Sequence, residues 1–378
     1  MRSSTEQRQL ERRVISEVRS GRAVSRRSLA NVMHLSPTTA GQYVDHLMAT
    51  GLLRETGLDQ GALGRPKRIL SVCGEVGWFA GLEFNAERVQ AVRVDFSGKH
   101  TRSERRVLVP GSDAATVLEV LAEMMEVLSE GAVGALLGIG MGVPGVVDLA
   151  NGVGVDYAFL SGWRDVPLTG PMEKRYQVPV TIDNNMRVIA LAERWFGGGR
   201  DFDDYIILGP RSGFGVAVMT EGRLLRGVHD AAGEAGRWPW PGLNGGRRVH
   251  DELSAPGVWR RLAGVAVGSN PPEPLETALA AYSNSESQAW QAVVTDFAHF
   301  MGCLQMLLDT RAFFLHGPLK VLGERFCAAV LMEMGGRFPE LKASMPLLKG
   351  SLLDDAAGAL GAASLVMEKW VPKSVGSV

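Results

Sequence analysis

The chain has 378 residues, of which 46% are hydrophobic and 21% are charged, and its net charge is −1. This length exceeds one ordinary compact domain, so two or three domains are expected. The composition favours a globular cytoplasmic protein without a membrane partner, because no apolar run is long enough to cross a bilayer and the basic N-terminus lacks the apolar core of a signal peptide.

The charge is unevenly distributed along the chain. Residues 1–70 contain 12 Lys and Arg against 6 Asp and Glu, whereas the rest contains 28 against 35. A basic head on an acidic body favours a polyanion as partner of the head, although a solvated basic surface would explain the charge as well. Three cysteines lie far apart without a ligand pattern and are expected to be reduced packing residues, at Cys73, Cys303 and Cys327.

Three short helices are predicted in the basic head. The first covers residues 10–18, Ser25 caps the second, and the third starts after Ser36 and Pro37 and ends near Gly51. Two helices joined by a tight turn, the second beginning with small polar residues, are typical of a helix-turn-helix. An ordinary three-helix cap is the alternative.

The first two turns of the third helix hold the candidate DNA contacts. In a helix-turn-helix the N-terminal residues of the second motif helix reach base edges in the major groove. Gln42 could read adenine, and Thr38 and Thr39 could contact phosphate or a thymine methyl group. Ser36 and Tyr43 complete the predicted DNA-binding set on this helix.

A wing is predicted directly after these helices. Residues 52–56 and 68–72 read as two strands, and the loop between them contains Gly-Arg-Pro-Lys. Proline keeps this basic segment extended, a shape that can lay an arginine in a narrow minor groove. Arg65 and Lys67 are therefore expected to touch double-stranded DNA.

Polar residues mark a candidate ligand site in the body. Residues 178–182 read as a buried strand, followed by Asp183, Asn184 and Asn185 and then by a helix that ends before three glycines at 197–199. Polar side chains where a strand gives way to a helix are placed as an α/β sheet places its ligand contacts. The alternative is that Asp183 or Asn184 only caps the helix.

An ordered series of motifs connects the chain to a known family. Leu-Gly-Ile-Gly-Met-Gly-Val-Pro-Gly at 137–145 is followed by Ser-Gly-Trp-Arg-Asp at 161–165, by Ser-Gly-Phe-Gly at 212–215 and by Ala-Gly-Glu-Ala-Gly at 232–236. In this order they resemble the ROK family of sugar kinases and sugar-responsive repressors, from about residue 10 almost to the C-terminus. The resemblance implies an α/β protein with a winged helix-turn-helix at 1–72 and a two-lobed actin-like ATPase body. The lobes would cover 73–182 and 183–378, with the last helix able to return to the first lobe.

The resemblance also implies that catalysis is lost. Family kinases use an aspartate as general base where this chain has Asn185, and an amide cannot accept the proton at neutral pH. The first phosphate-binding turn reads Glu-Phe-Asn-Ala-Glu at 83–87 and contains no glycine. Arg237 replaces a zinc-binding histidine, and no cysteine occurs in 239–254. We therefore expect no enzyme activity, no metal and no cofactor.

Effector contacts are implied by the family's sugar-binding positions. They would lie in the cleft between the lobes, and a sugar-contacting asparagine is replaced by Phe159 or by Leu160. Arg237 introduces a cation, which favours a sugar acid or sugar phosphate over a neutral hexose, unless it pairs with a neighbouring glutamate as a structural bridge. The expected effector-binding residues are Asn184, Asn185, Glu234, Arg237 and His250.

Together these features predict a DNA-binding transcriptional regulator. It would be a homodimer that binds a palindromic operator and represses carbohydrate-related genes until a sugar-derived effector binds. One alternative is a regulator whose body serves only for dimerisation. An active sugar kinase is the other, and it is opposed by Asn185 and by the altered phosphate turn.

Overall fold

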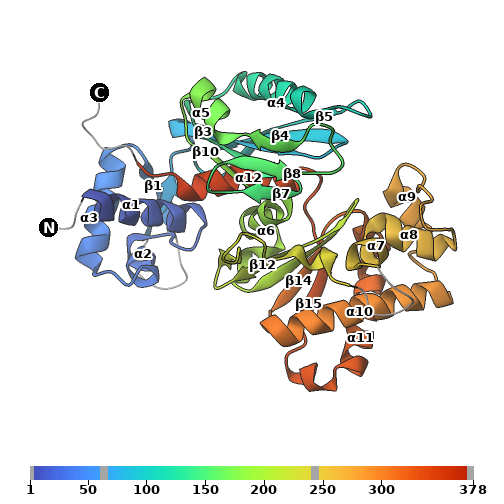
Figure 1. The fold of residues 1–378 in the computed structure, drawn as a ribbon. Coiled ribbons are helices and arrows are strands. Elements are labelled where there is room, and N and C mark those ends of the chain that lie inside the picture. The colour runs from blue at the N-terminus through green and yellow to red at the C-terminus, as the bar shows by residue number, and fades with distance from the viewer. Residues whose placement is uncertain (1–3, 60–66, 240–246, 373–378) are drawn as a thin grey trace. The chain divides into compact units, whose positions relative to one another are not determined.

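The computed structural model describes residues 4–59, 67–239 and 247–372 (Figure 1). The chain divides into two compact units. Unit 1 comprises residues 1–184 and 358–378, and unit 2 comprises residues 185–357. The last helix, α12 (Ala357–Lys369), therefore belongs to unit 1 from its second residue on, although the segment 185–357 that precedes it belongs to unit 2.

The head of unit 1 is a winged helix-turn-helix. It contains α1 (Ser4–Arg19), α2 (Arg26–Val32) and α3 (Pro37–Ala49), followed by the antiparallel strands β1 (Leu53–Asp59) and β2 (Lys67–Val72). Ser25 and Ser36 cap α2 and α3 as expected. Fully buried aliphatic side chains from all three helices hold the head together, among them Val14, Leu29 and Leu47.

The rest of unit 1 is the first lobe, built on a five-stranded sheet of order β10-β6-β3-β4-β5. Parallel pairing joins β10, β6 and β3, and antiparallel pairing joins β3, β4 and β5. A smaller sheet, β7-β8-β9, and the helices α4 and α5 complete the lobe. The strands are β3 (Gly77–Phe84), β4 (Arg88–Asp95), β5 (His100–Val107), β6 (Ala135–Val143), β7 (Val146–Asp148), β8 (Val153–Asp156), β9 (Arg164–Pro167) and β10 (Val180–Asn184), and the helices are α4 (Ala114–Ser129) and α5 (Thr169–Tyr176).

One expectation about β10 was wrong. Asp183 and Asn184 do not follow the strand but form its last two residues, because parallel pairing with β6 continues to Val143. Only Asn185 lies beyond it, as the first residue of α6 (Asn185–Phe196). The polar residues are still at the carboxyl end of a parallel strand, at the edge of the sheet, and open α/β sheets place ligand contacts at the carboxyl ends of their strands.

Glycines give α12 a flat surface on the first-lobe sheet. Gly81 of β3 and Gly140 of β6 are paired neighbours. A Cβ atom at Gly81 would collide with the carbonyl oxygen of Ala359, and one at Gly140 with that of Ala362. The opposite face of β3 is apolar and packs with α4 in the main core of the lobe. Close packing of the last helix therefore depends on small residues on both partners.

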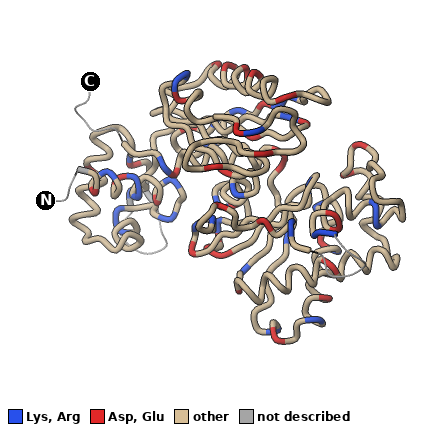
Figure 2. The backbone as a smooth tube through the Cα atoms, viewed as in Figure 1, with Lys and Arg blue, Asp and Glu red and all other residues tan. Residues whose placement is uncertain are grey.

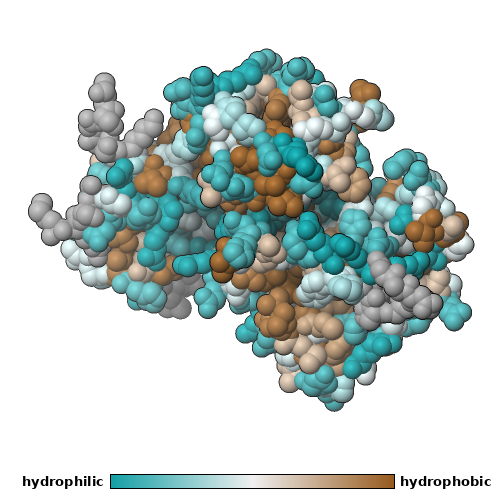
Figure 3. All heavy atoms as spheres, viewed as in Figure 1, coloured by the Kyte–Doolittle hydropathy of each residue, from teal (hydrophilic) through white to brown (hydrophobic). Residues whose placement is uncertain are grey.

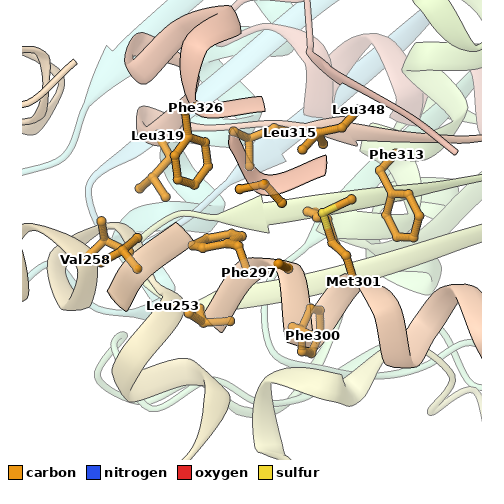
Figure 4. Close-up of a cluster of buried hydrophobic side chains, with 14 of the residues drawn as sticks. Leu253, Val258, Phe297, Phe300, Met301, Phe313, Leu315, Leu319, Phe326 and Leu348 are labelled. Atoms are coloured by element: carbon orange, nitrogen blue, oxygen red, sulfur yellow. The ribbon is translucent and has the colours of Figure 1, made fainter. Parts of the chain in front are cut away.

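Unit 2 contains a second five-stranded sheet, of order β13-β12-β11-β14-β15. Figure 4 shows its core, in which side chains of the long helix α10 contact those of β14 and α11. The rings of Phe297 and Phe326 are 5.3 Å apart between centroids. The strands are β11 (Tyr205–Pro210), β12 (Phe214–Thr220), β13 (Arg223–Leu224), β14 (Ala312–Leu315) and β15 (Leu347–Gly350), and the remaining helices are α7 (Val249–Leu253), α8 (Ala255–Ala263), α9 (Leu275–Ala280), α10 (Gln288–Leu308) and α11 (Gly323–Arg337). No helix among the described residues combines the length and the apolar character needed to cross a membrane.

A buried carboxyl group in unit 2 predicts a pH dependence of stability. Glu193 of α6 is fully buried, accepts a hydrogen bond from the amide of Gly198 (2.9 Å) and a second from the Ser351 hydroxyl. Burial raises the pKa of Glu193 above its ordinary value of 4.5, with these hydrogen bonds opposing the shift. The folded state therefore holds this proton at pH values where the unfolded chain has lost it.

The contribution of Glu193 to the free energy of unfolding is expected to be fully present below the pKa that this residue has in the unfolded chain. It should be lost as the pH rises through the raised pKa of the folded state. Glu193→Gln cannot ionise, so the Tm of the wild type relative to this variant should fall as the pH rises above the ordinary pKa of 4.5. Thermal denaturation of both proteins at several pH values measures the difference. A difference that does not change with pH would contradict an ionising, buried Glu193.

Candidate functional site

The N-terminal turns of α3 present two exposed polar side chains. The Ser36 hydroxyl accepts a hydrogen bond from the Thr39 amide (3.1 Å) and shares one with the Thr39 hydroxyl (2.8 Å). These two residues therefore cap the helix. Thr38 and Gln42 are exposed one turn apart, on one side of the helix, and Tyr43 is half-buried. The exposed pair is the part of the predicted set that is best placed to reach a base edge.

An ionic network joins the wing to the helices. Arg26 of α2 contacts Asp45 of α3 (2.7 Å) and Glu55 of β1 (2.8 Å), and Glu55 also contacts Arg68 of β2 (3.0 Å). Hydrogen bonds from Arg26 and then from Arg68 lower the pKa of Glu55, so it stays ionised at neutral pH. The network fixes the strands of the wing relative to α3. Figure 2 shows further Lys and Arg residues, in blue, along the backbone of the head.

The basic tip of the wing is only partly described. Arg65 lies outside the described residues. Lys67 is the first residue of β2 and pairs with Asp59 across the wing, while its side chain lies outside the description. The pairing of Asp59 with Lys67 thus places the two flanks of the wing loop side by side.

Arg19 connects the head to the first lobe. It is the last residue of α1, and its Nε donates to the Phe96 carbonyl (2.9 Å) while its Nη1 donates to the Met367 carbonyl of α12 (3.4 Å). The guanidinium carbon lies 4.7 Å from the centre of the Phe96 ring. Burial lowers the pKa of Arg19 to about 9, which leaves it charged at neutral pH. Sequence reasoning missed this joint, because its partners are 77 and 348 residues away.

Asn184 forms the polar end of β10 in unit 1. Its side-chain Nδ2 donates to the carbonyl of Gly145 (3.0 Å), and its backbone amide donates to the carboxylate of Asp183 (2.8 Å). Asp183 is buried and Asn184 is half-buried. Asn184 is thus oriented by the glycine-rich segment that follows β6.

The altered phosphate turn is closed by its own side chain. The carboxamide oxygen of Asn85 accepts hydrogen bonds from the amides of Glu87 (2.9 Å) and Arg88 (2.8 Å). Glu83 is buried, and a Cβ atom at Gly358 of α12 would lie only 2.5 Å from its Cγ. Backbone amides that could hold a phosphate are already used within the turn.

The second glycine-rich loop, at 212–215 in unit 2, is covered by side chains. A Cβ atom at Gly213 would lie 2.6 Å from the His250 ring, and one at Gly215 would lie 2.5 Å from Met186. The carbonyl of Gly213 accepts a hydrogen bond from the Arg211 amide (2.7 Å). Side chains of unit 2 therefore lie against the two glycines, and half-buried His250 forms part of this cover, whereas Ser212 of the loop is exposed.

The other predicted effector residues of unit 2 are accessible. Arg237 and Glu234 form an ion pair through Nε and Oε2 (2.9 Å), with 61% and 45% of their side chains exposed. This is the pairing that the sequence left as an alternative to ligand binding. Asn185 is half-buried at the start of α6.

No zinc-like cluster occurs in the described part of the chain: no three His, Cys, Asp or Glu residues there are grouped to hold a metal ion. Residues 240–246, in the region where the family places zinc-binding cysteines, lie outside the described residues. Their flanks are joined by a bridge between Pro239 and Arg248 and by the Val249 amide, which donates to the Trp238 carbonyl (3.0 Å). The absence of a metal remains a prediction from the missing cysteines.

Comparison with known proteins identifies relatives of the body. The model of the ROK family matches residues 79–369. The xylose repressor of Caldicellulosiruptor bescii is 28% identical over 226 residues, which are 59% of this chain and 56% of that protein, and the xylose repressor of Bacillus subtilis is 26% identical over 59% and 58%. The chain thus spans little more than half the length of these relatives. A glucokinase of Halalkalibacterium halodurans is 36% identical, but only over 27% of this chain and 30% of its own.

Solved structures show the same fold. A ROK family transcriptional regulator, a homologue of the E. coli MLC protein, aligns with a TM-score of 0.77 and 18% identity over 96% of both chains. A ROK family glucokinase from Streptomyces griseus, in complex with glucose and AMPPNP, aligns with a TM-score of 0.60 and 21% identity over 76% of this chain and 99% of its own. The alignment with the regulator extends over nearly the whole chain, head included.

Proposed function

The chain belongs to the ROK family, and on that premise we propose that it is a sugar-responsive transcriptional repressor that binds double-stranded operator DNA. The observation that carries the proposal is the winged helix-turn-helix with exposed Thr38 and Gln42 on α3. Two xylose repressors among its relatives support a repressor of carbohydrate-related genes. We expect a cytoplasmic homodimer whose two heads bind the half-sites of a palindrome.

The body is proposed to be a sensor that does not transfer phosphate. Asn185 stands at the position of the catalytic base, and an amide cannot accept the proton of a sugar hydroxyl. Asn85 occupies the amides of the phosphate turn, which also opposes nucleotide binding. A kinase would need a general base in place of Asn185 and a turn whose amides are not already hydrogen-bonded to Asn85.

The effector residues proposed for unit 2 are Asn185, Glu234, Arg237 and His250, and Asn184 is proposed for unit 1. The ion pair between Glu234 and Arg237 is exposed, and such pairs contribute only about 0–1 kcal/mol. A ligand carboxylate or phosphate can therefore replace Glu234 as the partner of Arg237 at small cost. This favours a sugar acid or sugar phosphate over a neutral hexose.

DNA selection from fragmented genomic DNA tests the function as a whole. The purified protein is expected to enrich a palindromic site, and a sugar-derived compound should release it from that site in fluorescence anisotropy. Phosphorylation of the same sugars is followed in parallel with ATP and Mg²⁺. Failure to enrich any sequence would refute the repressor, and phosphate transfer would refute the inactive body.

Replacement of Arg237 by glutamine tests the effector class. Binding of a sugar acid such as glucuronic acid should weaken about tenfold or more, because a charge-assisted hydrogen bond is lost. Binding of the neutral parent sugar should change little. Isothermal titration calorimetry measures both, with Arg223→Gln as control, since Arg223 is another exposed arginine of unit 2. Equal losses for both ligands would contradict a preference of Arg237 for an acid. No heat from either ligand would favour a locked ion pair and a body used only for dimerisation.

A further inference from the structure

An aromatic pair stands beside the polar end of β10. Tyr157 and Phe159 follow β8, and their rings lie 5.5 Å apart between centroids at an angle of 56°. Phe159 is 61% exposed, whereas Leu160 is only 4% exposed and belongs to the core of the lobe. Of the two residues that could replace the family's sugar-contacting asparagine, Phe159 is therefore the one that reaches the surface. Its ring does not belong to the core.

Contacts within unit 1 connect this pair to Asn184. Gly145 has a φ of +74°, and a Cβ atom there would collide with the Asp156 carbonyl and lie 3.1 Å from the Cβ of Tyr157. The carbonyl of Gly145 accepts the hydrogen bond from the Asn184 side chain (3.0 Å). Gly145 thus lies between the side-chain amide of Asn184, which can bind a hydroxyl, and the aromatic pair, which can bind an apolar group.

The apolar surface extends beyond the two rings. Val146 of β7 is 38% exposed and pairs with Asp156, next to Tyr157. Figure 3 shows hydrophobic residues gathered on the exposed face over the β7–β8 region of unit 1. Exposed apolar patches bordered by polar groups are typical of ligand-binding sites.

We propose that the effector is a glycoside, whose sugar binds Asn184 and whose second group places an apolar face on Phe159. A monosaccharide bound through Asn184 has no second group to place on the ring, whereas an aryl group or the C–H face of a second sugar is stabilised by stacking. This inference rests on the proposed sugar-sensing function. It adds the preferred size and polarity of the ligand.

Calorimetry with the full chain and matched probes tests the proposal. The free sugars are glucose, xylose and glucuronic acid, each compared with its phenyl β-glycoside, and cellobiose is compared with glucose. Aryl or disaccharide probes should bind on the order of three- to tenfold more tightly than the corresponding free sugar. Comparison of the phenyl glycosides with cellobiose shows whether an aryl group or a second sugar supplies the apolar face.

Three variants assign the preference to the ring. Phe159→Asn should abolish the preference for the glycoside, Phe159→Tyr should retain it, and Val133→Asn should leave it intact as an exposed control in the same unit. Tighter binding of glycosides that survives in Phe159→Asn would overturn the inference. Equal affinity for sugars and glycosides would overturn it and leave the sensor standing. No binding of any probe would overturn both.

Discussion

Replacing Gly140 by valine is expected to destabilise the protein by about 3 kcal/mol or more, because overpacking at a backbone contact cannot be relieved by a rotamer change. The position faces the Ala362 carbonyl in α12, and the paired Gly81 faces Ala359, so no space exists for a branched side chain. The helix would have to move away from the sheet. Chemical denaturation followed by circular dichroism should show a lower midpoint with the slope nearly unchanged.

Gly170→Ala is the matched control for this prediction. Gly170 lies in the first turn of α5, is exposed, and has no atom within 4 Å of the place of a Cβ. Alanine there should be neutral or should stabilise the helix by up to about 1 kcal/mol. Similar midpoints for Gly140→Val and the wild type would show that α12 does not pack closely on β3 and β6.

Replacing Gln42 by alanine is expected to weaken operator binding by about 1–3 kcal/mol, because a side chain that reads a base edge contributes this much to discrimination. The residue is exposed on α3, one turn beyond Thr38, while the helix cap is made by Ser36 and Thr39. The fold of the head should therefore be unaffected. Fluorescence anisotropy with the selected operator and with variants at each base pair would show a relaxed preference at one position.

Gln9→Ala is the matched control, since Gln9 is an exposed glutamine of α1 and does not belong to α2 or α3, the two helices of the helix-turn-helix motif. It should leave affinity and sequence preference unchanged. If Gln42→Ala lowered the affinity for all sequences equally, Gln42 would contact the DNA backbone and not a base. Unchanged binding would contradict a contact of Gln42 with DNA.

The sequence by itself determined the features that depend on neighbours along the chain. Caps at Ser25 and Ser36 fixed the starts of α2 and α3, because a cap is a hydrogen bond over three residues. That the amide of Asn185 cannot act as a general base followed from its residue type. The ordered motifs indicated the family, and the family model confirmed it.

Only the tertiary structure decided features that join distant segments. The sequence left Phe159 and Leu160 as alternatives, and the structure shows that Leu160 is buried in the lobe core and that Phe159 is exposed. It left the last helix free to return, and α12 lies in unit 1, on Gly81 and Gly140. The contacts of Arg19 with Phe96 and Met367 gave no local signal at all. The physical reason is that periodicity and capping act over a few residues, whereas packing depends on which surfaces the whole chain brings together.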